Sequence, residues 1–399
     1  MSLEVIYLNQ LGIICPLGNS PEEVKQRLLD RTQSGVSLTD DYSPGRLLPL
    51  GRIDAELPLP QVNHLDVVLR SRNNQVALAA LAQIRTAVDS AIEHYGRERV
   101  GVVIGTSTSG IAESEAAFRH YTINGSLPEK FHYGQQELSS LATLLAEELE
   151  IQGPAYVHSS ACASSAKALA SAARLICAGA CDAVLTGGVD TLCGFTVAGF
   201  AALESVSAIQ CNPLSRNRSG INIGEGGALF LMSREPGAVA LRGWGESSDG
   251  YHVSAPDPTG AGARLAIERA LSRAGISAES IEYINLHGTG TVQNDAMEAR
   301  VIHGLFSDAV AVSSTKPLTG HALGAAGAIE AGLCWLAMQD DNPAGRFPPH
   351  LWDGIPDPTL PLLNVAEPGS RLGRPLHWTL SNSFAFGGAN AALVFGRES

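Results

Sequence analysis

A cysteine stands where the sequence predicts that a strand turns directly into a helix. Cys162 follows a predicted strand at Tyr156–Ser160 and precedes an Ala-rich predicted helix that reaches Ala180. A thiol at a helix N-terminus is expected to lose its proton more readily, because it feels the positive end of the helix dipole. Its small neighbours leave room for a thioester, so the position suits a nucleophile. A buried helix cysteine, like Cys177 and Cys181 one turn apart, is the alternative interpretation.

Two histidines follow other predicted strands in the same way. His287 comes directly after a predicted strand at Ile281–Leu286, and His321 comes shortly after one at Ala309–Ser313. Glycine and threonine surround both of them. Because ligands in open α/β sheets bind at the carboxyl ends of strands, both imidazoles are expected to converge on Cys162. A single histidine is more often structural, but two at equivalent strand ends indicate a site.

Metal binding, hydrolysis and phosphate binding are the other chemistries that such residues can serve. The spacing offers no close ligand pair such as HxxxH or CxxC, so no metal site is predicted. A hydrolase triad, in which Asp295 or Glu298 orients His287, remains open. Phosphate-binding loops of the GxxxxGK[ST] or strand-linked GxGxxG type do not occur in the sequence. The glycines of Asn382–Asn390 either offer backbone N–H groups to an anion or form a simple bend.

The elements that must position these residues alternate between strand and helix, which predicts an α/β architecture with mostly parallel sheets. Residues 155–176 and 311–333 both have the pattern of a strand, a turn and a helix of small residues. Such an internal repeat suggests two similar halves. They are predicted at 1–240, with the cysteine, and at 241–399, with both histidines. The segment 36–66, rich in Pro, Gly and Asp, is predicted to be irregular.

Four motifs together resemble the β-ketoacyl synthase family of the thiolase-like superfamily. They are SSACASSAKA, HGTGTVQND, STKPLTGHALGAAGAIE and NSFAFGGAN, and they occur in the family's order and spacing over nearly the whole chain. The resemblance is strongest to the elongating β-ketoacyl-carrier-protein synthases, which have a Cys-His-His set. The initiating enzymes use Cys-His-Asn, and His321 argues against them. The resemblance implies a thiolase-like fold with two similar α/β halves in a layered αβαβα arrangement.

The resemblance implies an acyltransferase that performs a decarboxylative Claisen condensation. Cys162 would take an acyl group from the phosphopantetheine arm of a carrier protein. Backbone N–H groups of Cys162 and Phe386 would form the oxyanion hole for that transfer. His287 and His321 would bind the malonyl thioester of a second carrier protein and stabilise the enolate left when CO2 departs.

Further positions match residues that support the reaction in the family. The resemblance assigns Lys316 and Glu330 to organising the histidines, Asp295 and Glu298 to orienting the site, Thr289 and Thr291 to pantetheine binding, and Phe384 and Phe386 to the acyl gate. The gate departs from the family pattern, because Ala385 stands where the family has glycine. Alanine reaches positive φ values at greater cost, so a different gate movement is expected.

The family's basic stretch for docking the carrier protein is diluted in this chain. Asn212 stands where arginine is common, and Ser215 stands where an acid is common. The remaining docking candidates are Arg216, Arg218, Arg70 and Arg72. These departures favour a specialised relative that serves a polyketide, aryl-polyene or other secondary pathway.

Composition limits the partners and the compartment. The net charge of −13 and the absence of a Lys/Arg cluster argue against nucleic-acid binding. No apolar run approaches the roughly 18–20 residues of a membrane span. Seven cysteines without a CxxC pair, and no signal-peptide pattern, favour a cytoplasmic protein. The resemblance implies a carrier-protein partner, a homodimer, and no cofactor beyond the phosphopantetheine that arrives on the carrier.

Two alternatives remain beside the condensing enzyme. One is a coenzyme A-dependent thiolase-like enzyme. The other is a non-catalytic partner subunit, such as a chain-length factor, in which the active-site cysteine is usually replaced. Cys162 is intact, which favours the catalytic interpretation, while a heterodimer with such a partner stays open. Fatty-acid biosynthesis and polyketide or aryl-polyene biosynthesis are the expected settings.

Overall fold

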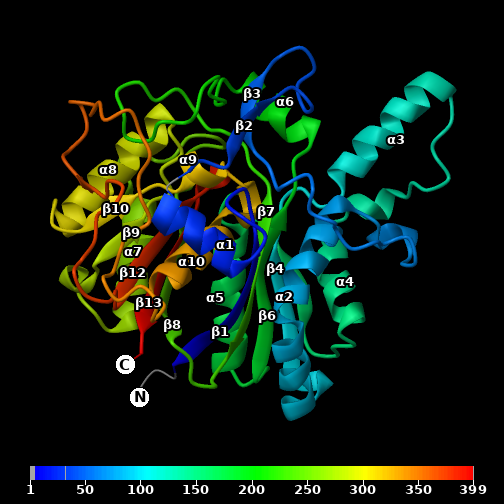
Figure 1. Ribbon diagram of the computed structural model, residues 1–399, viewed down its shortest axis with the longest axis horizontal. Helices are drawn as coiled ribbons and strands as arrows, with labels where there is room; N and C mark the ends of the chain where they lie inside the picture. The colour runs from blue at the N-terminus through cyan, green and yellow to red at the C-terminus, as the bar shows by residue number, and fades with distance from the viewer. Residues whose placement is uncertain (1–4, 32, 399) are drawn as a thin grey trace.

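One continuous mixed sheet runs through the molecule in a computed structural model that describes residues 5–31 and 33–398 (Figure 1). The strand order across it is β11-β10-β9-β12-β13-β8-β1-β7-β6-β4-β5. The strands are β1 (Ile6–Ile14), β4 (Val100–Gly105), β5 (Ala155–His158), β6 (Ala183–Asp190), β7 (Gly226–Ser233), β8 (Val239–Ser248), β9 (Tyr283–Asn285), β10 (Ala311–Ser313), β11 (Asn364–Val365), β12 (Trp378–Phe384) and β13 (Ala389–Arg397).

The two halves of this sheet repeat one topology. Outward from the β1–β8 contact, one side reads β1-β7-β6-β4-β5 and the other reads β8-β13-β12-β9-β10. Both therefore place their first, fifth, fourth, second and third strands in the same order. In each half, the two strand pairs nearest the β1–β8 contact are antiparallel, and the next two pairs outward are parallel. The predicted division after residue 240 stays a prediction, and β8 itself begins at Val239.

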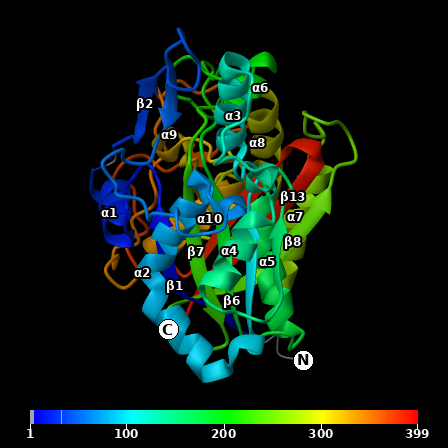
Figure 2. The same ribbon diagram turned by 90° about the vertical axis from the view of Figure 1, so that its right-hand side faces the viewer.

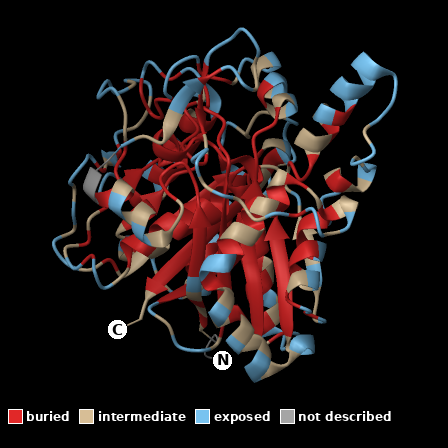
Figure 3. Ribbon diagram, turned by 45° about the vertical axis from the view of Figure 1, so that its right-hand side comes forward, coloured by how far each residue is buried: buried red, intermediate tan, exposed pale blue. Residues whose placement is uncertain are grey.

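Two helices lie between the halves and two pairs cover them from outside. Helices α5 (Ser164–Cys177) and α10 (Ala326–Ala337) contact each other and strands of both halves. Helices α2 (Arg72–Tyr95) and α4 (Ser140–Glu148) pack on the first half, and Figure 2 looks onto this side. Helices α7 (Ala261–Ala274) and α8 (Val292–Phe306) share a core with the second half. These layers give the αβαβα order, and Figure 3 shows buried strands between the helices.

Small residues let the two central helices approach closely. Almost every residue of α10 is buried, and alanine and glycine make up much of both helices. A Cβ atom on Gly327 would lie 3.0 Å from the Cβ and the backbone nitrogen of Ala166. The Ala-rich motifs of the sequence are therefore the contact between the halves.

Several elements differ from the sequence-based expectation. The segment 36–66 contains a two-stranded hairpin, β2 (Val36–Thr39) and β3 (Leu48–Gly51), whose second strand is fully buried. Helices α3 (Ile111–Asn124) and α6 (Gly194–Ala202) were not predicted. Helix α3 projects from the body in Figure 1 and buries only two side chains. A helix with so little buried surface needs no apolar stripe, which is why the sequence pattern did not predict it. No helix in the described part of the chain is long and apolar enough to span a membrane.

Candidate active site

Cys162 lies on the sharp turn between β5 and α5, as the sequence predicts. Ala161 adopts a left-handed conformation with φ of 46°, which turns the chain from strand to helix. The hydroxyl of Ser164 accepts a hydrogen bond from Ser160 N–H at 2.8 Å and donates one to the Ala161 carbonyl at 2.6 Å. These bonds hold the turn, and they present a nearly buried thiol at the start of the central helix.

The structure brings both predicted histidines to this thiol. Nε2 of His321 lies 3.0 Å from Sγ of Cys162. The ring of His287 stands almost perpendicular to that of His321, with 5.4 Å between the centroids. His287 follows β9, whereas His321 follows β10 and the short helix α9 (Lys316–Thr319). The carboxyl ends of two neighbouring parallel strands thus supply both imidazoles.

A buried ion pair stands behind His287. Nζ of Lys316 lies 2.5 Å from Oε1 of Glu330 on α10 and also donates to the backbone carbonyl of His287. Both side chains of the pair are almost completely buried. Burial raises the pKa of the Glu330 carboxyl, and the Lys316 ammonium opposes that rise. The pair is the arrangement that the family resemblance implied for these residues.

Burial and a neighbouring positive charge keep both imidazoles neutral. Burial, and then the neighbouring Lys316 charge, hold the pKa of His287 and of His321 well below the usual value for histidine. An ammonium can only donate, and Nζ of Lys316 lies 3.5 Å from Nδ1 of His287. The proton of His287 therefore sits on Nε2. Nδ1 of His321 has no hydrogen-bond partner, so His321 can adopt either tautomer without losing a bond.

The Cys162 thiol is not pre-ionised, which corrects the expectation of an acidic cysteine. Burial raises the pKa of Cys162 to about 12, although Lys316 and the backbone N–H groups of Phe386 and Cys162 act in the opposite direction. The helix N-terminus is present, but loss of water around the sulfur dominates. The thiol proton must therefore leave as the sulfur reacts, and His321 Nε2 is placed to receive it.

Two buried carboxylates shape the loop after β9. Glu298 accepts the backbone N–H groups of His287 and Gly288, both at 2.7 Å. Asp295 accepts those of Leu214 at 2.8 Å and Gly290 at 3.2 Å. Both carboxylates thus bind backbone instead of an imidazole nitrogen. The hydrolase-triad alternative is wrong for His287, because Lys316 faces its Nδ1.

The predicted gate residues line the pocket beside the thiol. Phe384 ends β12 with its ring 6.1 Å from that of His287, and the ring of Phe386 lies 5.5 Å from that of Phe200. The φ of Ala385 is −104°, an extended conformation that any residue adopts. Alanine in place of glycine therefore causes no strain in this conformation of the loop.

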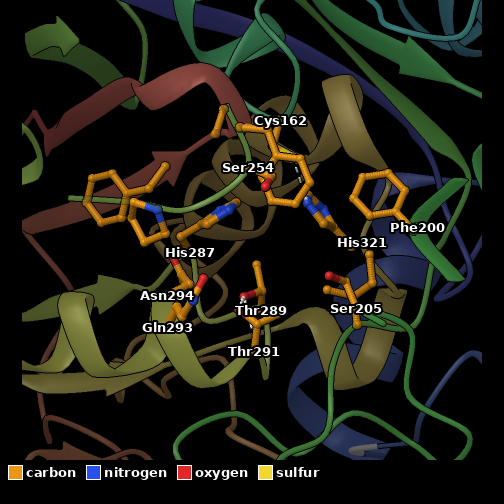
Figure 4. A pocket seen from close by; sticks show the side chains of 15 residues that line it. Cys162, Phe200, Ser205, Ser254, His287, Thr289, Thr291, Gln293, Asn294 and His321 are labelled. Carbon is orange, nitrogen blue, oxygen red and sulfur yellow. Dashed lines mark hydrogen bonds between the residues drawn. The ribbon is translucent and has the colours of Figure 1, made fainter. Parts of the chain in front are cut away.

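One pocket of about 580 Å³ collects these side chains (Figure 4). In that view His287 and His321 lie between Cys162 on one side and Thr289 and Thr291 on the other. The hydroxyls of the two threonines are 2.9 Å apart. Sequence reasoning missed several lining residues, which belong to α6, to loops and to the start of α8 without any motif of their own. They are Phe200, Ser205, Ile221, Ser254, Pro256, Gln293 and Asn294.

The docking arginines do not form one surface. The guanidinium of Arg218 is buried and lies 2.5 Å from Asp357, so the docking prediction is wrong for Arg218. Arg72 pairs with the buried Glu225 at 2.7 Å. Arg70 donates to the Leu65 carbonyl at 2.6 and 2.8 Å. Arg216 is exposed, and it remains a docking candidate.

The Cys-His-His cluster does not fit a metal ion. Potential ligand atoms of Cys162, His287 and His321 all lie within 4.8 Å of one another. Metal-binding histidines usually give their second N–H to a carboxylate or carbonyl. Here Nδ1 of His287 faces the Lys316 ammonium, which can only donate to it. The ring proton therefore stays on Nε2, and the ammonium adds a positive charge beside the cluster.

Family models and curated relatives match this chain over most of its length. The family models "Beta-ketoacyl synthase, N-terminal domain" and "Beta-ketoacyl synthase, C-terminal domain" match residues 10–237 and 238–348. The chain is 29% identical to 3-oxoacyl-[acyl-carrier-protein] synthase 2 of Staphylococcus aureus (strain COL), covering 98% of this chain and 97% of the relative. It is 28% identical to Nodulation protein E of Rhizobium meliloti (strain 1021), covering 98% of each.

A solved structure is similar over the whole chain. It is the ketosynthase ApeO in complex with its chain length factor ApeC from Xenorhabdus doucetiae, of which one chain is 43% identical, with a TM-score of 0.91. The match covers 99% of this chain and 98% of that one, and it confirms the predicted thiolase-like fold. The predicted enzyme class, an acyltransferase of the β-ketoacyl synthase type, is also confirmed, and the chain belongs to the β-ketoacyl synthase family.

Proposed function

We propose that this chain condenses a Cys162-bound acyl group with a malonyl group carried by an acyl carrier protein. The observation that carries the proposal is the 3.0 Å contact between Cys162 Sγ and His321 Nε2, with neutral His287 beside them on the floor of one pocket. A nucleophile, a proton acceptor and a second neutral donor are the groups that the two half-reactions need.

In the first half-reaction the thiol takes the acyl group. Cys162 sulfur attacks the thioester carbonyl of the acyl carrier, and its proton passes to His321 Nε2. The backbone N–H groups of Cys162 and Phe386, which lie close enough to the sulfur to lower the pKa of the thiol, would stabilise the oxyanion. When the tetrahedral intermediate collapses, the pantetheine thiol leaves and takes the proton. The products are acylated Cys162 and the free carrier thiol.

In the second half-reaction the malonyl thioester loses CO2. Its C–C bond breaks, and the electron pair forms an enolate whose oxygen accepts hydrogen bonds from Nε2–H of His287 and of His321. The enolate carbon attacks the acyl carbonyl on Cys162, the bond between that carbonyl carbon and the Cys162 sulfur breaks, and the β-ketoacyl product leaves on the second carrier. The Cys162 thiolate released in this step takes up one proton from solvent. Neutral donors suit this step, since they stabilise the enolate without holding the charged malonyl carboxylate.

The partners and the setting follow from the relatives and belong to the same proposal. The solved complex of which one chain is 43% identical pairs a ketosynthase with its chain length factor, which favours a second subunit of this kind over a homodimer for this chain. The intact Cys162 and both histidines make this chain the acylated member of such a pair. We place the reaction in polyketide, aryl-polyene or fatty-acid biosynthesis in the cytoplasm, with no cofactor beyond the phosphopantetheine of the carrier.

Intact-mass measurement tests the proposal directly. Purified protein is mixed with a panel of acyl carriers and malonyl-carrier, beside Cys162→Ala. Acyl adducts on wild type alone, with β-ketoacyl-carrier as product, are the expected result. The Cys162→Ala variant should still release CO2 from malonyl-carrier, and His287→Ala should not. Absence of adduct with every carrier, but adducts from acyl-coenzyme A, would replace the carrier-dependent reaction with the thiolase-like alternative.

A further inference from the structure

The pocket has a buried floor and a partly exposed mouth. Cys162, His287, His321, Thr289 and Asn294 are buried, whereas the remaining polar lining residues are less so. Figure 4 shows part of this second group, whose members come from three separate segments. The mouth consists of Ser205, Ser254, Pro256, Thr291 and Gln293.

Large apolar side chains flank the mouth residues on all three segments. Leu203 stands two residues before Ser205 and is 54% exposed. Val253 directly precedes Ser254 and is 75% exposed, and Val292 lies between Thr291 and Gln293 and is 60% exposed. Tyr251, 59% exposed, belongs to the same loop as Val253. We call Leu203, Tyr251, Val253 and Val292 the apolar collar.

Two of the collar residues, Tyr251 and Val292, line a groove outside the pocket. Pro256 and Gln293 line both the mouth and this groove, so the two hollows are continuous. Apart from one cation the groove is mainly apolar. Its other lining residues are Tyr251, Ala255, Pro258, Val292, Ala296, Met297 and Arg300.

Positive charge does not dominate around the mouth. Two of the arginines expected to dock an acidic carrier are held by carboxylates of this chain, Arg218 by Asp357 and Arg72 by Glu225. Arg300 is exposed but donates to the Pro258 carbonyl at 3.1 Å. Acidic neighbours, Glu204 beside Leu203 and Asp257 beside Pro256, add opposing charge. An acidic carrier gains little long-range attraction here.

We propose that the apolar collar is the docking surface for the carrier protein, held by apolar contact rather than by arginine–carboxylate pairs. This inference rests on the proposed function, because the carrier delivers its substrate on a covalent arm. A tether of fixed length forces the carrier to sit where the pocket opens. The mouth itself is mainly polar, but large exposed apolar side chains adjoin it on three segments. Exposed apolar side chains beside a site mark protein contacts.

The test compares a carrier-bound substrate with a free one. Leu203→Ser and Val292→Ser are assayed with malonyl-carrier and with malonyl-pantetheine, and the readout is the ratio of the two KM values. Each variant should raise this ratio about fivefold, as expected for a residue at the centre of an interface. Val292 is the first residue of α8, where serine is well tolerated, so folding is not at risk.

Leu362→Ser is the matched control. Leu362 is 70% exposed, and its carbonyl meets His303 near the other end of α8, about 16 Å along the helix from Val292. Its ratio should equal that of wild type. The KM for malonyl-carrier should also change less than about twofold with salt, because apolar contacts are not screened.

A different pattern would overturn the proposal. If the KM for malonyl-carrier rises steeply with salt and Arg216→Ala raises the ratio, while both serine variants leave it unchanged, docking is electrostatic. If wild type turns over neither substrate in the presence of its acyl donors, the proposed function itself fails and the docking surface falls with it. Turnover of malonyl-pantetheine therefore separates the two failures.

Discussion

At the scale of single residues, one buried cation adds to the effect of burial in keeping both imidazoles neutral. Lys316 faces Nδ1 of His287 and contributes to the lowered pKa of both histidines. Two neutral donors near a developing enolate stabilise it in the transition state without binding the carboxylate of the ground state too tightly. The lysine thus acts through the histidines, and its removal should change their titration.

We expect Lys316→Met to move the pH dependence of malonyl decarboxylation. A histidine with a lowered pKa stays neutral until the pH falls through that pKa, so the wild-type rate should hold as pH falls through about 6.5. Without the positive neighbour both pKa values rise, and the acidic loss of rate should move to higher pH. CO2 release from malonyl-carrier between about pH 5 and 8 measures this, with each rate normalised to its own maximum.

Lys130→Met serves as the comparison, because Lys130 is an exposed lysine on the loop that follows α3. Its pH profile should coincide with that of wild type. An unchanged profile in Lys316→Met would mean that burial alone keeps the imidazoles neutral. A loss of rate at all pH values with no shift would assign Lys316 a purely structural role.

The sequence predicts the identity of the reacting residues better than their environment. Cys162, His287 and His321 follow predicted strands, and strand ends meet at one edge of a sheet, so their convergence could be expected. The raised pKa of Cys162 could not be expected from the sequence, because burial of the thiol depends on segments far apart in the chain. Arg218 could not be placed either, because its partner Asp357 lies 139 residues away.

At the scale of elements, helix α8 fixes the loop that carries His287. Glu298 sits in the second turn of α8 and accepts two successive backbone N–H groups, with one oxygen on each. Burial raises the pKa of Glu298 to about 7, and these two bonds favour its ionised form. The carboxylate therefore acts as a substitute for a strand partner at the point where β9 ends.

Glu298→Gln should disturb this loop although it keeps the size of the side chain. One oxygen becomes an NH2 group that faces a backbone N–H, which leaves a buried donor without an acceptor. The expected loss is about 1–3 kcal/mol of unfolding free energy and at least about tenfold in kcat, because a small misplacement of His287 costs rate steeply. Denaturant titration and condensation assays measure the two effects.

The exposed Glu268→Gln on α7 is the matched substitution and should change unfolding free energy by less than about 0.5 kcal/mol. A Glu298→Gln protein with wild-type stability and wild-type kcat would contradict the positioning role. A lower free energy of unfolding with an unchanged kcat would mean that Glu298 stabilises the fold but does not position His287 for catalysis.

The elements that could not be predicted from the sequence are those without a strong hydrophobic pattern. Helix α6 places Phe200 at the pocket and ends just before the collar residue Leu203. Its Gly- and Phe-rich sequence shows no apolar stripe, and only Val197 of the helix is buried. The motifs predict the floor of the pocket, where strand ends and glycine turns leave a signature. The mouth depends on loops whose positions come from tertiary packing.

At the scale of the whole molecule, the contact between α5 and α10 sets the distance between nucleophile and base. Cys162 lies two residues before the start of α5, and the chain runs from His321 through a short turn, Leu323–Ala325, into α10. The two halves meet through these helices, with Gly327 against Ala166 and near Ser383. The 3.0 Å gap between Cys162 and His321 therefore depends on how closely two small-residue helices pack.

Gly327→Ala should push the halves apart. The new Cβ would lie 3.0 Å from Ala166 Cβ, Ala166 N and Ser383 Oγ, and overpacking of this kind costs about 1–3 kcal/mol. Acylation of Cys162 should slow more than stability alone explains, because the thiol moves away from His321.

The double variant Gly327→Ala with Ala166→Gly tests whether the lost contact is the cause, since it removes the opposing methyl group and should restore much of the acylation rate. Gly199→Ala on α6 is the control: its Cβ would meet nothing within 4 Å, so alanine should stabilise the helix by up to about 1 kcal/mol and leave the acylation rate unchanged. Stopped-flow acylation with an acyl-carrier, compared with denaturant midpoints, separates the two effects. Equal acylation rates in wild type and Gly327→Ala would mean that the site tolerates relative movement of the halves, and that the strand ends alone position its residues.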